Sequence, residues 1–132
     1  HLLEEKNNTY FKSASGGPMV QHSLLAMIEL SKKGNFTLET VVDKMCHAPA
    51  ILYKIEKRGF IREGYHADIV LVNPNSGQVV TKESLLYKCG WSPLDGETLS
   101  SKVIMTFVNG RLVYNNGVFE ESAKGMALSF NE

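Results

Sequence analysis

The spacing of apolar residues changes once along this chain, and this change limits the fold more than any other feature of the sequence. Between residues 20 and 53, apolar residues recur every three or four positions, as they do along one face of a helix. After Gly59 they gather in short β-branched runs that end in Asn, Pro and Gly. Helices therefore precede strands, without the alternation of the two that builds a parallel sheet, and the order predicts an α+β fold.

Two helices and a short third one are predicted in the first part of the chain. In residues 20–33 the apolar positions follow the i, i+4, i+7, i+8 pattern, and Gly34 follows a cationic last turn. Thr37 can cap a second helix that runs through Cys46. Pro49 is expected to stop this helix and to open a third one through Tyr53. Residues 1–18, rich in charge, Asn, Ser and Gly, are expected to form a long loop.

Strands are predicted in the second part, in residues 67–72, 78–81, 103–108 and 111–114. The last two are joined by Asn109-Gly110, a pair typical of type I′ hairpins because both central residues of that turn need φ > 0. Asn116-Gly117 is a second turn signal of the same kind. In the tail, residues 126, 128 and 130 are apolar with period 2, which indicates either an added strand or a docked extension.

Composition excludes several classes of partner. Fourteen basic residues balance fourteen acidic ones, so no net charge favours nucleic acid or an anionic membrane. No apolar run approaches the roughly 20 residues that span a bilayer, and the first residues do not resemble a signal peptide, so a cytoplasmic location is expected. Cys46 and Cys89 are too few for a disulfide framework and are expected to be reduced thiols.

Few residues carry an obvious chemical pattern. The four histidines form neither an HxH nor an HExxH motif, so no metal site is expected within the chain. His22 lies one position off the apolar stripe and is expected to be partly buried or exposed. The adjacent Cys46 and His47 are expected to pack or to cap, because neighbouring side chains diverge on a helix. Gly16-Gly17-Pro18 before a helix allows two interpretations, an anion-binding loop and a tight turn, and spacing alone favours the turn.

Three segments resemble the amidohydrolase superfamily, and within it the dihydroorotases. Residues 1–6 are similar to the end of the dihydroorotase segment Asp-His-Ala-Pro-His-x-x-Glu-Glu-Lys, whose leading aspartate, a metal ligand at the end of the eighth barrel strand, is absent here. Residues 59–72 resemble the Gly-x-Ile-x-x-Gly-x-x-Ala-Asp signature that begins the C-terminal strands of amidohydrolases. Residues 91–96 and 103–114 resemble the Ser-Pro-(Phe/Leu)-x-Gly and Val-x-x-Thr-hydrophobic-Val-x-Gly-Arg close of dihydroorotases and hydantoinases.

The resemblance implies a parent enzyme with a TIM barrel and a small composite β-sandwich, in which one or two zinc ions activate a bridging hydroxide. Residues 1–57 are then expected to be the final active-site loop and helices of the barrel, and residues 58–132 antiparallel strands of the sandwich and a tail. The implied reaction is the reversible hydrolysis of the cyclic amide of dihydroorotate to N-carbamoyl-aspartate in pyrimidine biosynthesis. Hydantoinase-like, dihydropyrimidinase-like or allantoinase-like ring opening remains an alternative, as does a non-catalytic assembly subunit.

The resemblance also implies which residues of this chain contact the substrate. His1 matches the histidine that holds the substrate carboxylate, and an imidazole N–H donor suits that anion. Ala14, Gly16 and Gly17 match a stretch whose backbone amides approach the substrate. No catalytic residue and no metal ligand of the family falls within the chain, so it is expected to be a C-terminal fragment that holds no zinc and is inactive alone. Its unpaired apolar faces and open strand edges predict self-association as a homo-oligomer.

Overall fold

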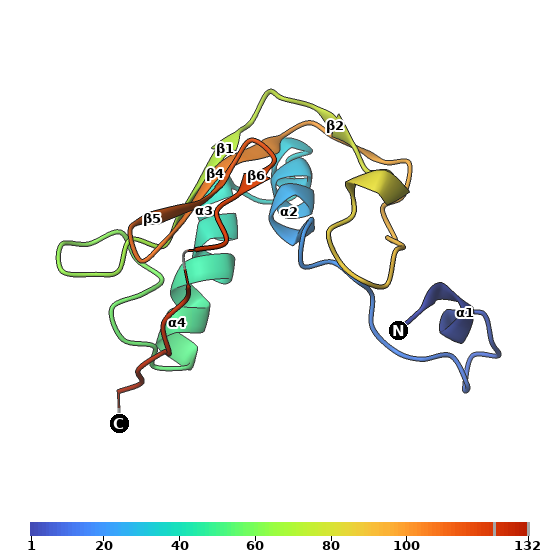
Figure 1. Cartoon of the computed structure of the whole chain (residues 1–132), viewed down its shortest axis with the longest axis horizontal. Coiled ribbons are helices and arrows are strands. Elements are labelled where there is room, and N and C mark those ends of the chain that lie inside the picture. Colours follow the sequence, from blue (N-terminus) through green and yellow to red (C-terminus); the bar gives the residue numbers. More distant parts are fainter. Residues whose placement is uncertain (123, 132) are drawn as a thin grey trace.

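The computed structural model describes residues 1–122 and 124–131, which form an arch with the two ends of the chain at its opposite feet (Figure 1). The α-helices are α1 (Leu3–Lys6), α2 (Ser23–Lys32), α3 (Leu38–Val42) and α4 (Ala48–Leu52). The strands are β1 (Ile69–Asn73), β2 (Gln78–Val79), β3 (Thr98–Leu99), β4 (Lys102–Val108), β5 (Arg111–Asn115) and β6 (Val118–Phe119). Helices precede strands, and the α+β fold is confirmed.

The second predicted helix does not stop at Pro49. Thr37 caps its start as predicted, because the Thr37 hydroxyl accepts a hydrogen bond from the Thr40 N–H. From there α3 continues through a π-helical turn, Asp43–His47, directly into α4, so the predicted break is wrong. A proline inside an α-helix collides with the carbonyl four residues earlier. The wider π turn ahead of Pro49 relieves that collision and lets the helix continue.

The larger sheet is antiparallel and has the strand order β1-β4-β5-β6. Both predicted turns are present: φ is 51° at Asn109 and 78° at Gly110, and it is 47° at Asn116 and 97° at Gly117. Each turn joins neighbouring strands of the sheet, β4 to β5 and β5 to β6. The short strands β2 and β3 form a separate two-stranded sheet. All four predicted strands are therefore confirmed, although the second is only two residues long.

A β-bulge interrupts the pairing of β1 with β4. Leu71 is opposite Met105, but the next residue, Val72, is opposite Val103, so Ile104 has no partner in β1. Such an extra residue bends a strand and increases its twist. Because of this bulge, Val72 and Val103 both pack against the buried cluster beside α2.

Helix α2 links the helical part to the strands. Its Leu25 and Ile28 form one buried cluster with Val80, which follows β2, and Leu99 of β3. At the end of α2, the Glu29 carboxylate accepts hydrogen bonds of 2.5 Å from both the N–H and the hydroxyl of Ser100. The core is therefore small and lies between α2 and β2–β3.

Asp68, in the Ala-Asp pair of the strand signature, holds the hairpin turn in place. Its carboxylate accepts a 2.8 Å hydrogen bond from the Asn109 N–H and pairs with Arg58, whose other terminal nitrogen donates to the Asn109 side chain at 2.8 Å. Burial raises the pKa of Asp68, but these hydrogen bonds and the Arg58 charge outweigh it, so the pKa lies below its usual value. The Asp68 carboxylate is therefore held between the Asn109 backbone and the Arg58 guanidinium, and its role here is structural.

The tail docks against the end of α4. Phe130 forms an isolated antiparallel bridge with Ile55, the Glu56 N–H donates to the Ser129 carbonyl at 2.9 Å, and the Asn131 N–H donates to the Lys54 carbonyl at 2.9 Å. Of the two predictions for the tail, the docked extension is the one observed. No helix within residues 1–122 and 124–131 combines the length and the hydropathy needed to cross a membrane.

Candidate functional site

His1 is exposed and lies beside the short helix α1. Its Nδ1 is 3.3 Å from Oε2 of Glu5, one turn further on. The same carboxylate oxygen accepts a 2.6 Å hydrogen bond from the Leu2 N–H, a group that α1 itself leaves without a partner. Glu5 therefore fixes the backbone that enters α1 and also orients the His1 imidazole.

Lys6 brings the glycine-rich segment back to α1. Its ammonium donates hydrogen bonds to the carbonyl oxygens of Ala14 and Gly16. The Ser13 hydroxyl donates to the Lys6 carbonyl at 2.6 Å, which closes the loop from the other side. Residues 1–16 therefore form one small unit at the end of the arch (Figure 1).

Trp91 connects this unit with the strand-rich part of the chain. Its indole Nε1–H donates a 3.0 Å hydrogen bond to the His1 carbonyl. The Lys6 ammonium lies 5.9 Å from the centroid of the Trp91 ring, within reach of a cation–π interaction. Lys6 and Trp91 belong to the family motifs in the sequence, but no contact between them was predicted. The only feature that singles out Trp91 in the sequence is that it is the one tryptophan of the chain.

The predicted site residues thus lie close to one ammonium group. Ala14 and Gly16 contact Lys6 directly, and His1 is joined to Lys6 by α1 and by Trp91. Within the described residues no group accepts a hydrogen bond from the N–H of Gly16 or Gly17. Gly16 has φ of 85°, and nothing lies within 4 Å of where a Cβ would stand on either glycine. Imidazole, ammonium and free amides are all donors, so the unit is suited to an anion such as a carboxylate.

No metal-ligand cluster accompanies these donors. In the part of the chain that the structure describes, no three His, Cys, Asp or Glu side chains come together in a way that could hold a metal ion. Cys46 and Cys89 are free thiols. His47 stacks on Phe60 with ring centroids 4.4 Å apart, which agrees with the packing role predicted for it.

The prediction that His22 is partly buried or exposed is wrong, because only 2% of it is exposed. Residues 84–87 cover it: the Gln21 side chain binds the Ser84 carbonyl at 2.8 Å and the Leu86 N–H at 2.9 Å, and the Tyr87 ring meets the imidazole edge-on at 6.3 Å. Nδ1 of His22 has no hydrogen-bond partner among the described residues, and burial lowers the pKa of the imidazole. The apolar pattern of the helix could not predict the burial of His22, because the residues that cover it lie more than 60 positions later in the chain.

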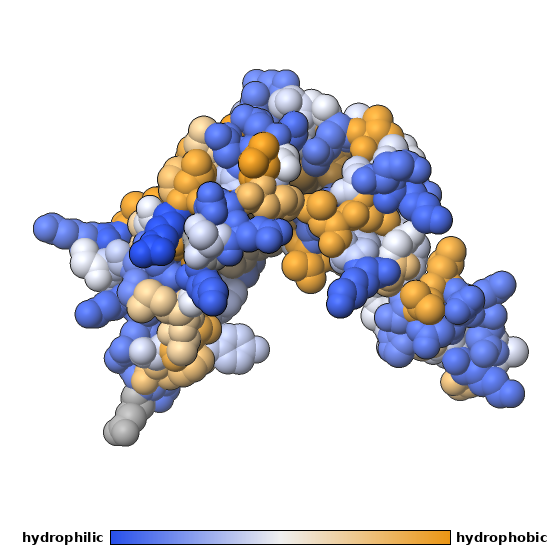
Figure 2. Space-filling model, viewed as in Figure 1, coloured by the Kyte–Doolittle hydropathy of each residue, from blue (hydrophilic) through white to orange (hydrophobic). Residues whose placement is uncertain are grey.

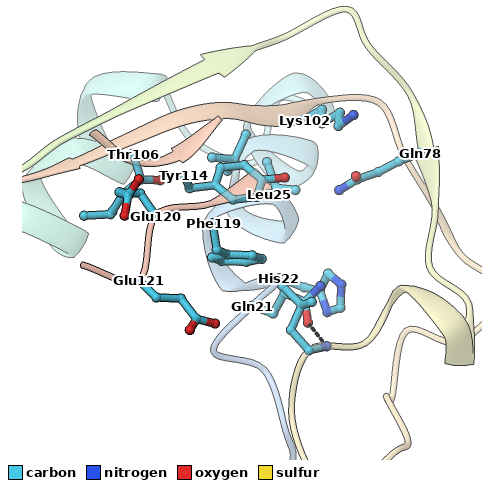
Figure 3. Close-up of a pocket in the computed structure, with 13 residues that line it drawn as sticks. Gln21, His22, Leu25, Gln78, Lys102, Thr106, Tyr114, Phe119, Glu120 and Glu121 are labelled. Atoms are coloured by element: carbon cyan, nitrogen blue, oxygen red, sulfur yellow. Dashed lines mark hydrogen bonds between the residues drawn. The ribbon is translucent and has the colours of Figure 1, made fainter. Parts of the chain in front are cut away.

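A cleft of about 480 Å³ opens beside His22, between α2 and the sheet (Figure 3). Leu25, Val103 and Phe119 supply apolar walls, while Lys102 and Glu121 supply charges. Apolar residues gather along the inner curve of the arch (Figure 2). The cleft holds none of the residues predicted to bind substrate, so it is separate from the His1 unit.

Comparisons with known proteins agree with this picture. The model of the amidohydrolase family matches residues 10–113. A curated dihydroorotase of Clostridioides difficile is 39% identical over 116 residues, which are 87% of this chain and 27% of that protein. The dihydroorotase of Clostridium acetobutylicum is 34% identical over 88% of this chain and 27% of its own length. The chain thus spans about a quarter of the length of the curated relatives that it matches.

Solved structures show the same fold. L-hydantoinase (dihydropyrimidinase) from Arthrobacter aurescens superimposes with a TM-score of 0.75 over 83% of this chain and 25% of that chain, at 26% identity. D-hydantoinase (dihydropyrimidinase) from Thermus sp. gives a TM-score of 0.79 over 91% of this chain and 27% of that chain; its 16% identity makes this a likeness of fold alone. Sequence and fold therefore lead to the same group of proteins.

Proposed function

Because this chain belongs to the amidohydrolase family, we propose that it is part of a dihydroorotase, which hydrolyses the cyclic amide of dihydroorotate reversibly to N-carbamoyl-aspartate. One observation carries the proposal: His1 and the glycine-rich segment, which the resemblance assigns to the substrate, are joined through Lys6 and Trp91 into one exposed cluster of donors. The curated dihydroorotases that match most of the chain support it.

In this proposal the chain contributes binding and orientation. His1 donates from its imidazole to the carboxylate of the substrate, and the free backbone amides of Gly16 and Gly17 donate to the same anionic region. The Ala14 N–H already donates to the Glu5 carbonyl at 3.5 Å, so Ala14 contributes by fixing the loop beside α1. The Glu5 carboxylate, 3.3 Å from Nδ1 of His1, keeps the ring in one orientation, so that its other nitrogen is presented to the substrate. Hydrogen bonds to a charged acceptor are stronger than neutral ones. By fixing the substrate carboxylate, they also fix the position of the amide carbonyl at which the ring is opened.

Zinc would supply an activated hydroxide for the hydrolysis. The described residues do not fit such a centre, since they bring no three candidate ligands together. No step of the reaction is therefore assigned to a metal held by this chain. We propose that the zinc ligands of the enzyme lie outside these 132 residues. The 132-residue chain alone would then bind no zinc and would not hydrolyse the substrate.

The same proposal divides the chain by role. Residues 1–57 would belong to the end of the hydrolase barrel, with the substrate loop, and residues 58–132 to the small β-sandwich. The change from helices to an antiparallel sheet after α4 supports this boundary. The hydrogen bond from Trp91 to His1 crosses it, so the sandwich part also supports the substrate loop.

Activity of the protein encoded by the complete gene tests the function. Dihydroorotate, dihydrouracil and hydantoin are offered separately, and products are measured by chromatography. We expect ring opening of dihydroorotate, and in His1→Ala a KM raised by about tenfold or more, the usual cost of losing a charge-assisted hydrogen bond. The exposed Lys12→Met, on the same loop, is the matched control and should keep the wild-type KM.

Other outcomes would contradict the proposal in different ways. Turnover of dihydrouracil or hydantoin without dihydroorotate would favour the hydantoinase-like alternative, which the 26% identity and TM-score of 0.75 to L-hydantoinase make the strongest competitor. Absence of all three activities, together with substituted metal ligands upstream of His1 in the gene, would favour an assembly subunit. Stoichiometric zinc and turnover in the 132-residue chain alone would refute the proposed division of labour.

A further inference from the structure

Helix α1, which follows His1 directly after Leu2, has no buried face that would fix its position. It has four residues and no buried side chain. A single helical turn is unstable on its own, because its nucleation cost exceeds the one or two hydrogen bonds that it gains. The position of His1 therefore depends on contacts from outside α1.

Trp91 makes one of these contacts, at the backbone. Its indole N–H is a donor only, and it binds the His1 carbonyl at 3.0 Å across 90 positions of sequence. Because the bond is made to the main chain, it leaves the imidazole unblocked: Nδ1 lies beside Glu5, and the other ring nitrogen remains free for a ligand. The Trp91 side chain is half-buried.

The second set of contacts is made by Lys6, the last residue of α1, to groups outside the helix, and its ammonium lies where three segments meet. It donates to the carbonyls of Ala14 and Gly16, and it faces the Trp91 ring at 5.9 Å. An ammonium has three donor hydrogens and a full charge, so it can hold two carbonyls while it is attracted to an aromatic face. Removing it would leave the loop and the indole without their shared partner.

The hydrogen bonds of Lys6 also determine where the loop amides point. In a trans peptide the C=O of one residue and the N–H of the next point in opposite directions. Since the Ala14 and Gly16 carbonyls face the ammonium, the N–H groups of Ser15 and Gly17 face away from it, and both residues are exposed. Lys6 thus binds the acceptors of the loop and leaves its donors turned outward.

We infer that Lys6 and Trp91 are positioning residues: together they hold the His1 backbone beside the glycine-rich segment, and Lys6 turns the amides of Ser15 and Gly17 outward to receive an anion. The inference rests on the proposed function for the identity of the anion, the carboxylate of a cyclic amide or of its opened product. The geometry of the clamp itself does not depend on that identity.

The test uses the complete protein and the variants Lys6→Met and Trp91→Phe, with Lys12→Met as the matched control. Lys6→Met keeps the aliphatic stem and removes the donors and the charge, whereas Trp91→Phe keeps a ring and removes the N–H. We expect KM for dihydroorotate to rise about tenfold or more in each variant, with a smaller change in kcat, because the clamp touches no reacting atom. The double variant should cost less than the product of the two single effects, since both act on one cluster.

Hydrogen exchange of residues 2–17 gives a second measurement that needs no turnover. Lys6→Met should speed exchange in this segment, and Lys6→Arg, which keeps charge and several donors, should restore both slow exchange and most of the lost affinity. Wild-type exchange and unchanged KM in Lys6→Met and Trp91→Phe would overturn the clamp while leaving the function intact. Faster exchange in an enzyme that opens no dihydroorotate would instead retain the clamp and reject the proposed substrate.

Discussion

Gly59 is the residue whose identity the fold restricts most. Its φ is 78°, and a Cβ there would stand 2.4 Å from the Ala50 Cβ and 2.8 Å from the Cys46 carbonyl oxygen. The chain turns back against its own helix at this point, so neither the backbone nor the neighbours leave room for a side chain.

We therefore expect Gly59→Ala to destabilise the protein by about 3 kcal/mol, the sum of a left-handed backbone and an overpacked contact. Gly64 is the matched control, because its φ is 79° but nothing lies within 4 Å of a Cβ there. Gly64→Ala should cost only about 1 kcal/mol. Urea denaturation measures the free energy of unfolding of both variants. Equal decreases in the two variants would show that the close approach of residue 59 to Ala50 does not contribute to the cost.

His22 makes stability depend on pH. Burial holds the pKa of the folded imidazole below the usual histidine value of about 6.5, so just below that pH the unfolded chain binds a proton that the folded chain does not. Stability is therefore complete above about pH 6.5 and is lost as the pH falls toward the folded pKa.

Replacing the imidazole should remove this contribution. We expect thermal unfolding of His22→Phe to change less between about pH 7.5 and pH 5.5 than that of the wild type. Tyr87→Phe, which keeps the edge-on ring and the imidazole, should retain the wild-type pH dependence. Equal pH dependence in His22→Phe and wild type would contradict this role for the buried imidazole.

At this scale the sequence predicted local chemistry but not distant partners. The cap at Thr37 and the hairpin turn at Asn109 follow from short-range rules, and both are observed. Burial of His22 and the contacts of Lys6 and Trp91 depend on residues more than 60 positions away or on loop shape, which no local pattern contains. The roles of His1, Ala14, Gly16 and Gly17 in binding substrate stay predictions.

Among the elements, α2 and the chain after β3 are joined by charge-assisted hydrogen bonds. The two hydrogen bonds from Ser100, and the charges of Lys32 and Lys33, outweigh the effect of burial and lower the pKa of Glu29. Lys32 donates in turn to the Ser100 hydroxyl at 2.6 Å and to the Pro74 carbonyl. The end of α2 therefore fixes the approach of two loops.

Glu29→Ala should release Ser100. We expect the amide of Ser100 to exchange with solvent about tenfold faster or more, because a partly buried charge-assisted hydrogen bond is lost. Glu39→Ala is a suitable control, since Glu39 lies exposed in the first turn of α3. If Ser100 exchanged at the same rate in both variants, the link between α2 and β3 would not depend on this carboxylate.

Element types were predictable from the sequence, and their junctions were less so. The 3.6-residue apolar period identified α2, and short β-branched runs bounded by turn residues identified the strands β1, β4 and β5. Pro49 gave the wrong boundary, because its rule assumes an unbroken α-helix and a π turn changes the geometry ahead of it. The pairing of the tail with Ile55 could not be chosen in advance, since a period of 2 fits any extended partner.

Across the described residues, more large apolar side chains are exposed than are buried in the small core. Strand β1 is an edge of the larger sheet, and its Val70 and Leu71 are 45% and 47% exposed. At the opposite edge, Val118 and Phe119 of β6 are 71% and 52% exposed. Open edges with apolar side chains favour pairing with another chain.

We therefore expect the isolated chain to associate as its concentration rises, and Val70→Lys to weaken that association by placing a charge on the edge. Ile61→Lys adds the same charge at a side chain that is 89% exposed and lies outside the strands, so it serves as the control. Sedimentation velocity over a wide concentration range distinguishes the variants. A monomer at every concentration would contradict the prediction of a homo-oligomer.

The unpaired Ile104 has a consequence for how the chain tolerates changes of length. Deleting that one codon would allow an unbroken ladder between β1 and β4, which looks like an improvement in backbone pairing. Residues opposite each other on neighbouring strands share a face of the sheet, so the shortened β4 would keep Val103 beside Val72 and facing the buried cluster, and Lys102 opposite Asn73. The deletion would instead remove the Ile104 carbonyl, which accepts a 2.9 Å hydrogen bond from the Asn116 N–H. Homologous chains that lack one residue here should therefore differ in the turn between β5 and β6.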